Sequence, residues 1–233
     1  MNIAVILSEK GFHWEEYAAA YLEFARLGAD VEIFTPAGGF PSPDPYSVRK
    51  TGVFSRLGFG VPGEIALDAP AGKRAAKTLE MKRPVAGMDP HRFDVLYLAG
   101  GHGCLFDLNV NRDLHEKIRK MHAKGSVLSG VCHATSTFAL AGVAGGKKLT
   151  GFPEGLDKLL LFLGLVHEDL LPIPFSNEKT LEEHGAVMTS EDKVKGFFYP
   201  GYALAERPFV TGVGPKAARR VAELAVRMAQ GEI

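Results

Sequence analysis

The chain has little of three things that would place it in a special class of protein: cysteine, net charge and long apolar runs. Its two cysteines cannot build a disulfide framework. Its 27 Lys and Arg residues balance 27 Asp and Glu residues, so no global charge attracts nucleic acid or an anionic membrane. No apolar run reaches the length of a membrane span. With no charged-then-apolar leader at Met1, the sequence predicts a cytoplasmic protein with free thiols and neither nucleic acid nor membrane as a partner.

What the chain does have is enough apolar sequence for one core. Of its 233 residues, 46% are hydrophobic, and a chain of this size buries most of the surface that it exposes when unfolded. Its 27 glycines and 14 prolines exceed the average share but remain below that of low-complexity chains. We therefore expect a single domain over residues 1–233, with the excess Gly and Pro in turns.

The order of strand and helix patterns predicts an α/β fold. Residues 3–7 form an apolar run, residues 14–27 have the pattern of an amphipathic helix that ends at Gly28, and residues 30–34 alternate like a strand. A strand, a helix and a strand in this order form a right-handed parallel crossover. The sequence therefore predicts a mostly parallel sheet with helices on both faces.

A segment rich in Gly and Pro, at about residues 36–90, interrupts this pattern. We predict that it is a long insertion with little regular structure and one short helix near residues 73–78. After it, the sequence predicts strands at residues 93–98, 126–129, 148–151 and 209–211. It predicts helices at residues 112–124, 133–141, 157–163, 178–184 and 215–229, of which 157–163 has the composition of a buried helix and 178–184 has Ser176 as its N-cap.

The most informative stretch is Gly130-Val131-Cys132-His133-Ala134, between an apolar strand and a helix of small residues. It has the form of a nucleophile elbow, a strained turn that needs small residues two before and two after the nucleophile. The following helix places its positive dipole near the sulfur, so we expect a lowered pKa for Cys132. His133 is then the candidate base. The alternative is that Cys132 is a small buried apolar residue, as most isolated cysteines are.

A second signal is Ala99-Gly100-Gly101-His102-Gly103, directly after the strand at 93–98. The amides of Gly100 and Gly101 could hold an oxyanion or a carbonyl oxygen at the carboxyl edge of the sheet, and His102 could line the same pocket. An ordinary tight turn would explain the two glycines about as well. No Gly-x-Gly-x-x-Gly spacing follows the first strand, which disfavours a nicotinamide cofactor.

Two carboxylates, Glu15 and Glu16, open the first helix. The helix dipole alone explains acidic residues in a first turn. However, this helix begins at the carboxyl edge of the sheet, so one of the two could face Cys132. A carboxyl group buried beside a thiolate would have a raised pKa and could stay protonated, donating a hydrogen bond to the sulfur.

Together these motifs resemble the DJ-1/PfpI superfamily of glutamine-amidotransferase-like proteins. Further segments resemble its heat-shock-protein-31-like, glyoxalase III-like branch: Thr35-Pro36-Ala37-Gly38-Gly39, Phe106-Asp107, Thr150-Gly151-Phe152-Pro153 and Val210-Thr211-Gly212. The resemblance implies a flavodoxin-like three-layer sandwich, a homodimer, and neither a metal nor an organic cofactor. By position, it implies Cys132 as nucleophile, His133 as adjacent base and Glu16 as the carboxyl group that contacts the sulfur. It also implies an acidic third member, either Asp157 or Glu154, with Asp157 preferred.

The resemblance leads to three hypotheses on function. The first is a cofactor-independent glyoxalase III, which converts methylglyoxal-like 2-oxoaldehydes to 2-hydroxy acids, or a deglycase that repairs early glycation adducts. The second is a cysteine peptidase or amidase in which the acidic group orients His133. The third is not enzymatic: a holding chaperone for unfolded proteins, or a sensor in which Cys132 is oxidised.

Overall fold

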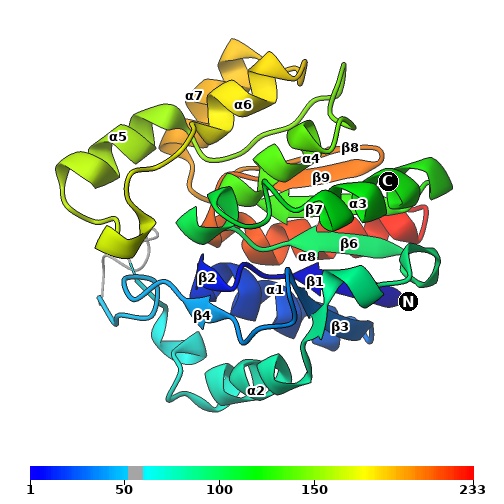
Figure 1. The fold of residues 1–233 in the computed structure, drawn as a ribbon, viewed down its shortest axis with the longest axis horizontal. Helices are drawn as coiled ribbons and strands as arrows, with labels where there is room; N and C mark the ends of the chain where they lie inside the picture. The colour runs from blue at the N-terminus through cyan, green and yellow to red at the C-terminus, as the bar shows by residue number, and fades with distance from the viewer. Residues whose placement is uncertain (52–59) are drawn as a thin grey trace.

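The computed structural model describes residues 1–51 and 60–233. Within these residues, the main sheet has seven strands in the order β5-β3-β1-β6-β7-β9-β8 (Figure 1). All neighbours are parallel except β8, which runs antiparallel beside β9. The predicted fold class is therefore confirmed. The strands are β1 Asn2–Ile6, β3 Asp30–Thr35, β5 Arg83–Pro84, β6 Val95–Leu98, β7 Val127–Val131, β8 Ala203–Glu206 and β9 Phe209–Gly212, and β2 Lys10–Phe12 with β4 Ser42–Pro43 forms a separate small sheet.

Helices connect the strands. The α-helices are α1 Trp14–Arg26, α2 Pro70–Thr78, α3 Arg112–Lys124, α4 Ser136–Leu140, α5 Glu154–Phe162, α6 Asn177–Glu183, α7 Ser190–Phe198 and α8 Ala218–Ala229. Short 3₁₀ helices are η2 Gly63–Ile65, η3 Leu79–Met81, η4 Val85–Gly87, η5 Pro90–Arg92, η6 His102–Leu105, η7 Cys132–Thr135, η8 Glu168–Leu170 and η9 Pro215–Ala217. Figure 1 shows α5, α6 and α7 grouped beyond one end of the strands.

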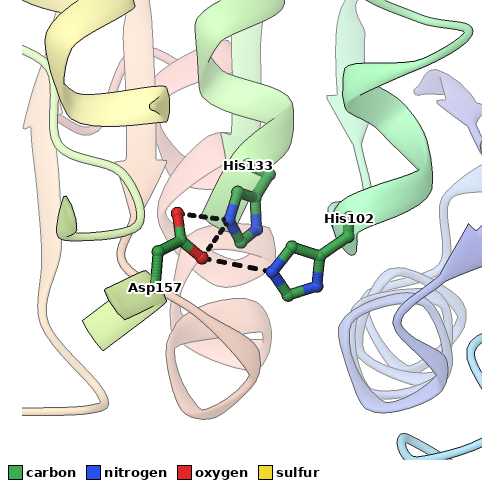
Figure 2. Close-up of side chains that lie close together, drawn as sticks. All are labelled: His102, His133 and Asp157. Atoms are coloured by element: carbon green, nitrogen blue, oxygen red, sulfur yellow. Dashed lines mark hydrogen bonds and ion pairs between the residues drawn. The ribbon is translucent and has the colours of Figure 1, made fainter. Parts of the chain in front are cut away.

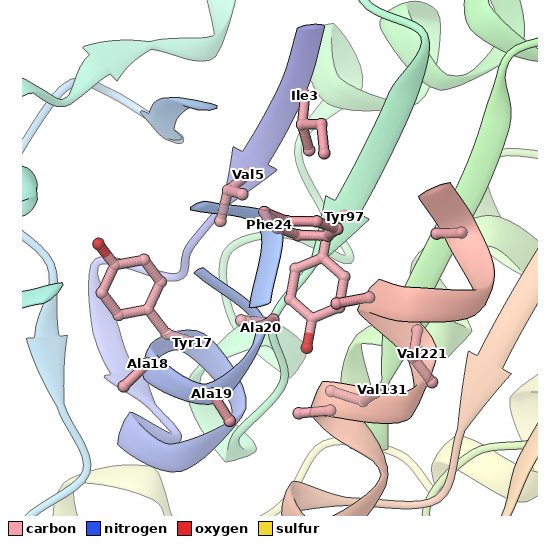
Figure 3. Close-up of a cluster of buried hydrophobic side chains, with 14 of the residues drawn as sticks. Ile3, Val5, Tyr17, Ala18, Ala19, Ala20, Phe24, Tyr97, Val131 and Val221 are labelled. Atoms are coloured by element: carbon pink, nitrogen blue, oxygen red, sulfur yellow. The ribbon is translucent and has the colours of Figure 1, made fainter. Parts of the chain in front are cut away.

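Alternating side chains along the strands divide the core into two layers. On β1, Ile3 and Val5 enter one buried cluster, whereas Ala4 and Ile6 enter the other. The first cluster packs against α1 and α8, and the second packs against α3 and α4. Because successive side chains of a strand point to opposite faces, helices are needed on both sides to bury them. Figure 3 shows part of the first cluster, where Phe24 of α1 packs on Tyr97 of β6 with its ring centroid 5.5 Å away.

The parallel register brings three sequence-distant segments to one edge of the sheet. Strands β1, β6 and β7 are neighbours, so the segments that follow their carboxyl ends emerge side by side. These segments carry Glu16 on α1, the glycines after β6, and Cys132 after β7. The carboxyl edge of an open α/β sheet is the usual place for a ligand.

Two predicted elements differ from the structure. Residues 148–151 are not a strand: their one ladder contact is an isolated bridge between Lys148 and Val187. Beside β9, the Thr150 amide donates to the side-chain hydroxyl of Thr211 (2.9 Å), so this bond is not a rung of a backbone ladder. The helix predicted at 157–163 exists as α5, but it is not buried. Asp157 is its one buried residue, and Phe162 is 86% exposed.

Some elements of the structure were predicted only in part, and others were not predicted. The short helix of the insertion is confirmed as α2, although it begins earlier than predicted, and residues 52–59 of the insertion lie outside the described residues. Helix α7 and strand β8 were not predicted. No helix among the described residues has the length and apolar character to cross a bilayer.

Candidate active site

Cys132 lies at a sharp turn between β7 and η7. Its φ is 58°, and it is the one non-glycine residue with a positive φ among the described residues. A non-glycine residue in the left-handed region costs on the order of 1–3 kcal/mol, so the surrounding structure must hold it there. The predicted nucleophile elbow is therefore present. The side chain is 4% exposed, which keeps the sulfur out of bulk water but within reach of a cavity.

His133 and Asp157 form a chain of hydrogen bonds that starts at this sulfur. The Cys132 Sγ lies 3.2 Å from His133 Nδ1. On the other side of the ring, His133 Nε2 lies 2.9 Å and 3.0 Å from the two oxygens of Asp157 (Figure 2). With the ring proton on Nε2, the imidazole donates to the carboxylate and leaves Nδ1 free to accept the thiol proton.

A second histidine shares the same carboxylate. His102 Nε2 lies 3.1 Å from Asp157 Oδ1, and the rings of His102 and His133 have centroids 4.3 Å apart. Although burial by itself would raise the pKa of Asp157, its contacts with the two histidines hold that pKa below its ordinary value. Burial lowers the pKa of His133. The nearby Asp157 carboxylate raises it and so offsets part of this effect, but the pKa remains below its ordinary value. At neutral pH the pair is therefore a carboxylate and a neutral imidazole, the state required of a base.

Glu16 also interacts with the Cys132 side chain. Its side chain is fully buried, and its Oε2 accepts a hydrogen bond from the Gly100 amide (2.7 Å). Burial raises the pKa of Glu16 from 4.5 to about 8, although its interactions with Cys132 and Gly100 lower it somewhat. The carboxyl group is therefore protonated at pH 7. Its buried Oε1 accepts and donates no hydrogen bond among the residues that the structure describes, so a proton on this oxygen is not committed to another group.

The predicted lowering of the thiol pKa is wrong. Burial raises the pKa of Cys132 well above its ordinary value, and an ionised Glu16 would raise it further. The helix that follows the turn is only a 3₁₀ turn and five residues of α4, which gives a weak dipole. A resting thiol consequently needs a base to become nucleophilic, and His133 Nδ1 is the nearest one.

The two glycines after β6 have different roles in the structure. The Gly100 amide donates its hydrogen bond to Glu16, so this N–H is not free for an oxyanion. A Cβ at Gly100 would lie 2.6 Å from Glu16 Oε2 and 2.7 Å from Cys132 Cβ, so only glycine permits this approach. Gly101 has φ 108° and lines the cavity beside Cys132, where its amide is the remaining candidate for an oxyanion donor.

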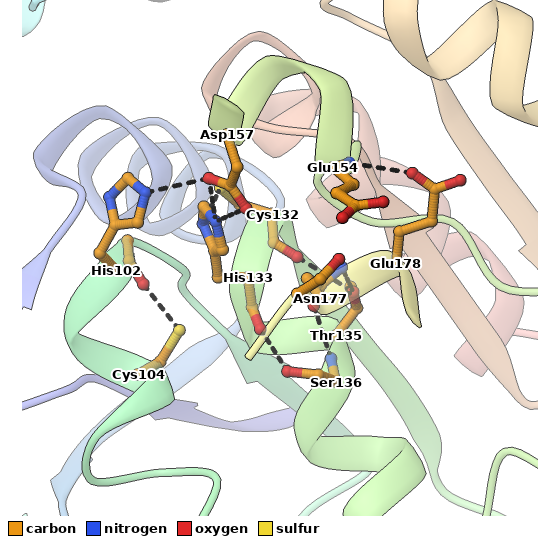
Figure 4. Close-up of polar contacts among 12 residues, drawn as sticks. His102, Cys104, Cys132, His133, Thr135, Ser136, Glu154, Asp157, Asn177 and Glu178 are labelled. Carbon is orange, nitrogen blue, oxygen red and sulfur yellow. Dashed lines mark hydrogen bonds and ion pairs between the residues drawn. The ribbon is translucent and has the colours of Figure 1, made fainter. Parts of the chain in front are cut away.

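A buried asparagine that sequence reasoning missed supports the turn. Asn177, at the start of α6, is completely buried. Its Oδ1 accepts from the Ser136 amide (3.0 Å), and its Nδ2 donates to Thr135 Oγ1 (3.2 Å) (Figure 4). Asn177 therefore fixes the backbone just after Cys132. Its neighbour in sequence, Ser176, was recognised as an N-cap, and the structure confirms this bond to the Lys179 amide.

The other candidate residues lie elsewhere. Glu154 pairs with Lys158 and Lys179 on the outer side of α5 and does not contact His133, so the structure brings Asp157 and not Glu154 to the site. Glu15 forms an ion pair with Lys216 (2.7 Å). The Cys104 thiol donates to the Gly101 carbonyl (2.7 Å), and burial raises its pKa well above the ordinary value.

A cavity of about 450 Å³ opens onto Cys132, His133 and His102. Residues of the insertion between Asp44 and Thr51 line one side of it, and α5 and α7 line the other. The ring of Phe152 stacks on His133 with centroids 4.6 Å apart. The cavity is large enough for a small organic ligand, since such sites measure about 300–1,000 Å³.

His102, His133 and Asp157 are also the donor types that transition metals favour. Within the described parts of the chain, this is the one group of such side chains whose ligand atoms all lie within 4.8 Å of one another. In the structure, each of the two imidazole rings forms a direct hydrogen bond with Asp157.

These features define a class of protein: an open parallel α/β sheet with a strained cysteine after a central strand, a histidine directly after it, and a protonated carboxyl group from the first helix. The sequence profile of the DJ-1/PfpI family matches residues 1–193. The chain belongs to the DJ-1/PfpI family.

Within this family, the chain is similar to curated glyoxalases from fungi. It is 24% identical over 231 residues to the glutathione-independent glyoxalase hsp3101 of Schizosaccharomyces pombe, a match that covers 94% of this chain and 88% of the relative. It is 27% identical over 153 residues to Glyoxalase 3 of Candida albicans, where the match covers 62% of this chain but only 61% of the relative.

Solved structures confirm the fold over the whole chain. The structure of glyoxalase III from Candida albicans superimposes with a TM-score of 0.73 at 20% identity and covers 97% of this chain and 96% of its own. The Rapid Encystment Protein of Francisella tularensis superimposes with a TM-score of 0.72 at 21% identity, covering 98% of both chains.

Proposed function

We propose that the protein is a glutathione-independent glyoxalase, which converts a 2-oxoaldehyde and water to a 2-hydroxy acid. The observation that carries this proposal is that one sulfur has two partners: His133 Nδ1 at 3.2 Å, and the buried, protonated Glu16 carboxyl group. The names of the fungal relatives support the same activity.

The first step is the addition of sulfur to the aldehyde carbon. His133 Nδ1 accepts the thiol proton, and the imidazolium that forms is stabilised by Asp157, which already accepts from Nε2. The thiolate then attacks the aldehyde, and a carbon–sulfur bond replaces the carbonyl π bond to give a hemithioacetal. Gly101 lines the cavity, which supports its amide as the donor to the oxyanion.

The second step moves a proton between the two carbons of the substrate. A base removes the hydrogen on the carbon attached to sulfur, and the adjacent ketone carbon is reprotonated, which gives the thioester of a 2-hydroxy acid. His133, neutral again after protonating the hemithioacetal oxygen, is the base, and Glu16 is a buried proton donor that interacts with Cys132. Water then hydrolyses the thioester, releasing the 2-hydroxy acid and returning the Cys132 thiol. No redox partner is required.

The experiment is to measure lactate production from methylglyoxal, without glutathione, by the purified protein and by Cys132→Ala. The wild type should produce lactate, and Cys132→Ala should lose at least about 10³-fold in kcat, because the covalent route is removed. Equal activity in both proteins would reject the proposal. Cys104→Ala is the matched control, since it removes the other buried thiol.

A second candidate function is that of a cysteine hydrolase, which the Cys132–His133–Asp157 hydrogen bonds favour. In such an enzyme Cys132 is acylated by an ester or amide, and Asp157 holds the His133 ring. Hydrolysis of p-nitrophenyl acetate and of a peptide anilide, with no lactate from methylglyoxal, would favour it over the glyoxalase.

Further properties belong to the same proposal. They are one catalytic domain over the whole chain, a homodimer, a cytoplasmic location, repair of early glycation adducts and holding of unfolded proteins. The exposed aromatic side chain of Phe162 (86% exposed), which does not line the cavity, supports a surface that contacts other proteins. Light scattering after size-exclusion chromatography tests the dimer, and suppression of client aggregation by Cys132→Ala tests a chaperone role that needs no catalysis.

A further inference from the structure

We infer that the preferred substrates are 2-oxoaldehydes that carry a bulky apolar group, such as an aryl or branched alkyl glyoxal, and not three-carbon methylglyoxal. This inference rests on the proposed function and names the substrate class of the same site. The observation behind it is the contrast between two sets of residues that line the cavity: the reacting groups around Cys132, and the apolar side chains of α5 and α7.

One part of the cavity lining holds the reacting groups. Cys132, His133, His102 and Gly101 belong to it; Cys132 lies at hydrogen-bond distance from His133, and both histidines from Asp157. A 2-oxoaldehyde presents two adjacent carbonyl groups, which need a nucleophile and hydrogen-bond donors. These residues are therefore suited to the dicarbonyl head of any such substrate.

A second part of the cavity lining is an apolar wall. It consists of Leu156, Leu159 and Leu160 of α5, Leu165 after the helix, and Phe197 and Phe198 of α7. Leu159 and Leu160 follow Leu156 by three and four residues, so the three side chains lie on one face of α5. The same helix carries Asp157 to His133. Because one helix holds both the catalytic carboxylate and the leucine face, the apolar wall has a fixed position relative to the sulfur.

Two side chains of this apolar wall are partly exposed in the described part of the chain, residues 1–51 and 60–233. Leu159 is 43% exposed and Phe197 is 42% exposed. Covering apolar surface is favourable in proportion to the area removed from water, and a methyl group covers far less of it than an aromatic ring. The cavity volume of about 450 Å³ also falls in the range that holds drug-sized ligands, whereas methylglyoxal would leave most of it to water.

The chain provides a matched pair of positions to test this inference. Leu159 and Leu161 lie on the same helix and are 43% and 42% exposed, but Leu159 lines the cavity and Leu161 does not. The substitutions Leu159→Asn and Leu161→Asn therefore change the same residue type at the same exposure and differ in whether they face the substrate.

The experiment measures kcat/KM for phenylglyoxal and for methylglyoxal with the wild type and both variants. We expect the ratio of phenylglyoxal to methylglyoxal to be about tenfold or more in the wild type. The ratio should fall about fivefold in Leu159→Asn and change less than about twofold in Leu161→Asn. A wild-type ratio near one, or equal effects of the two substitutions, would overturn the inference. Thermal unfolding of both variants checks that they are folded.

Binding of the products distinguishes failure of this inference from failure of the proposed function. Mandelate and lactate are the 2-hydroxy acids that correspond to the two aldehydes, and isothermal titration with the wild type needs no catalysis. Mandelate should bind about tenfold more tightly than lactate, and Leu159→Asn should remove most of the difference. If neither aldehyde is turned over but this binding pattern holds, the proposed function fails and the apolar specificity stands. Equal binding of the two acids would overturn the inference even in an active glyoxalase.

Discussion

Replacing Glu16 with Gln removes one fully buried group that can ionise and leaves a side chain of nearly the same shape. Burial raises the pKa of Glu16 from 4.5 to about 8 in the folded protein, whereas an unfolded chain restores the ordinary value. At any pH between these values, folding requires that the carboxyl group take up a proton. Gln needs no proton, so Glu16→Gln should become relatively more stable than the wild type as the pH rises.

The size of this effect follows from the pKa shift. The folded state binds the proton more tightly than the unfolded state, so its contribution to stability is fully present below pH 4.5 and is lost as the pH rises toward 8. Each pH unit in this window is worth about 1.4 kcal/mol. The free energy of unfolding of the wild type should therefore lose about 3 kcal/mol at pH 7, and about 5 kcal/mol above pH 8, relative to Glu16→Gln.

The assay is urea unfolding of both proteins from about pH 4.5 to about pH 8.5, because the difference at each pH cancels all other titrating groups. Any loss or gain from burying an amide is the same at every pH, so the slope with pH isolates the proton. Glu183→Gln, at an exposed position of α6, controls for the substitution itself. A difference in unfolding free energy between wild type and Glu16→Gln that does not change with pH would refute a protonated, buried Glu16.

Three further predictions follow from the same geometry. Asp157→Asn keeps an acceptor for the His133 ring but removes its charge, so kcat for methylglyoxal should fall by about 10²–10⁴-fold; an unchanged kcat would contradict the role of this carboxylate. Gly100→Ala places a methyl group 2.6 Å from Glu16 Oε2 and should lower the free energy of unfolding by about 1–3 kcal/mol, and a fully stable variant would mean that Glu16 lies elsewhere. Dialysis against a chelator should leave methylglyoxal turnover unchanged, whereas a loss that a divalent cation restores would show that the cofactor-independent mechanism is wrong.

The fold and the centre of the site were predictable because they depend on local patterns. Parallel strands buried on both faces are continuous apolar runs, as at residues 3–7 and 95–98, and these are visible in the sequence. The turn at Cys132 was visible because a strained elbow needs small neighbours, here Gly130 and Ala134.

Other features depend on contacts that no local pattern encodes. Apolar spacing on α5 could not distinguish a core helix from a cavity wall, since both need leucines on one face. Asn177 supports Ser136 across 41 residues, and the Gly100 amide is taken by Glu16 from 84 residues away. The thiol pKa was predicted in the wrong direction because burial of Cys132, which the tertiary structure sets, outweighs the short helix beside it.

The measurement that tests the central claim most directly is mass spectrometry of the protein quenched during turnover of methylglyoxal. If Cys132 is the nucleophile and His133 accepts its proton, a peptide containing Cys132 should gain the mass of one substrate molecule. The peptide containing Cys104 should not, and His133→Ala should show little adduct on Cys132. Turnover with no adduct on Cys132, or with the adduct on Cys104, would contradict the account.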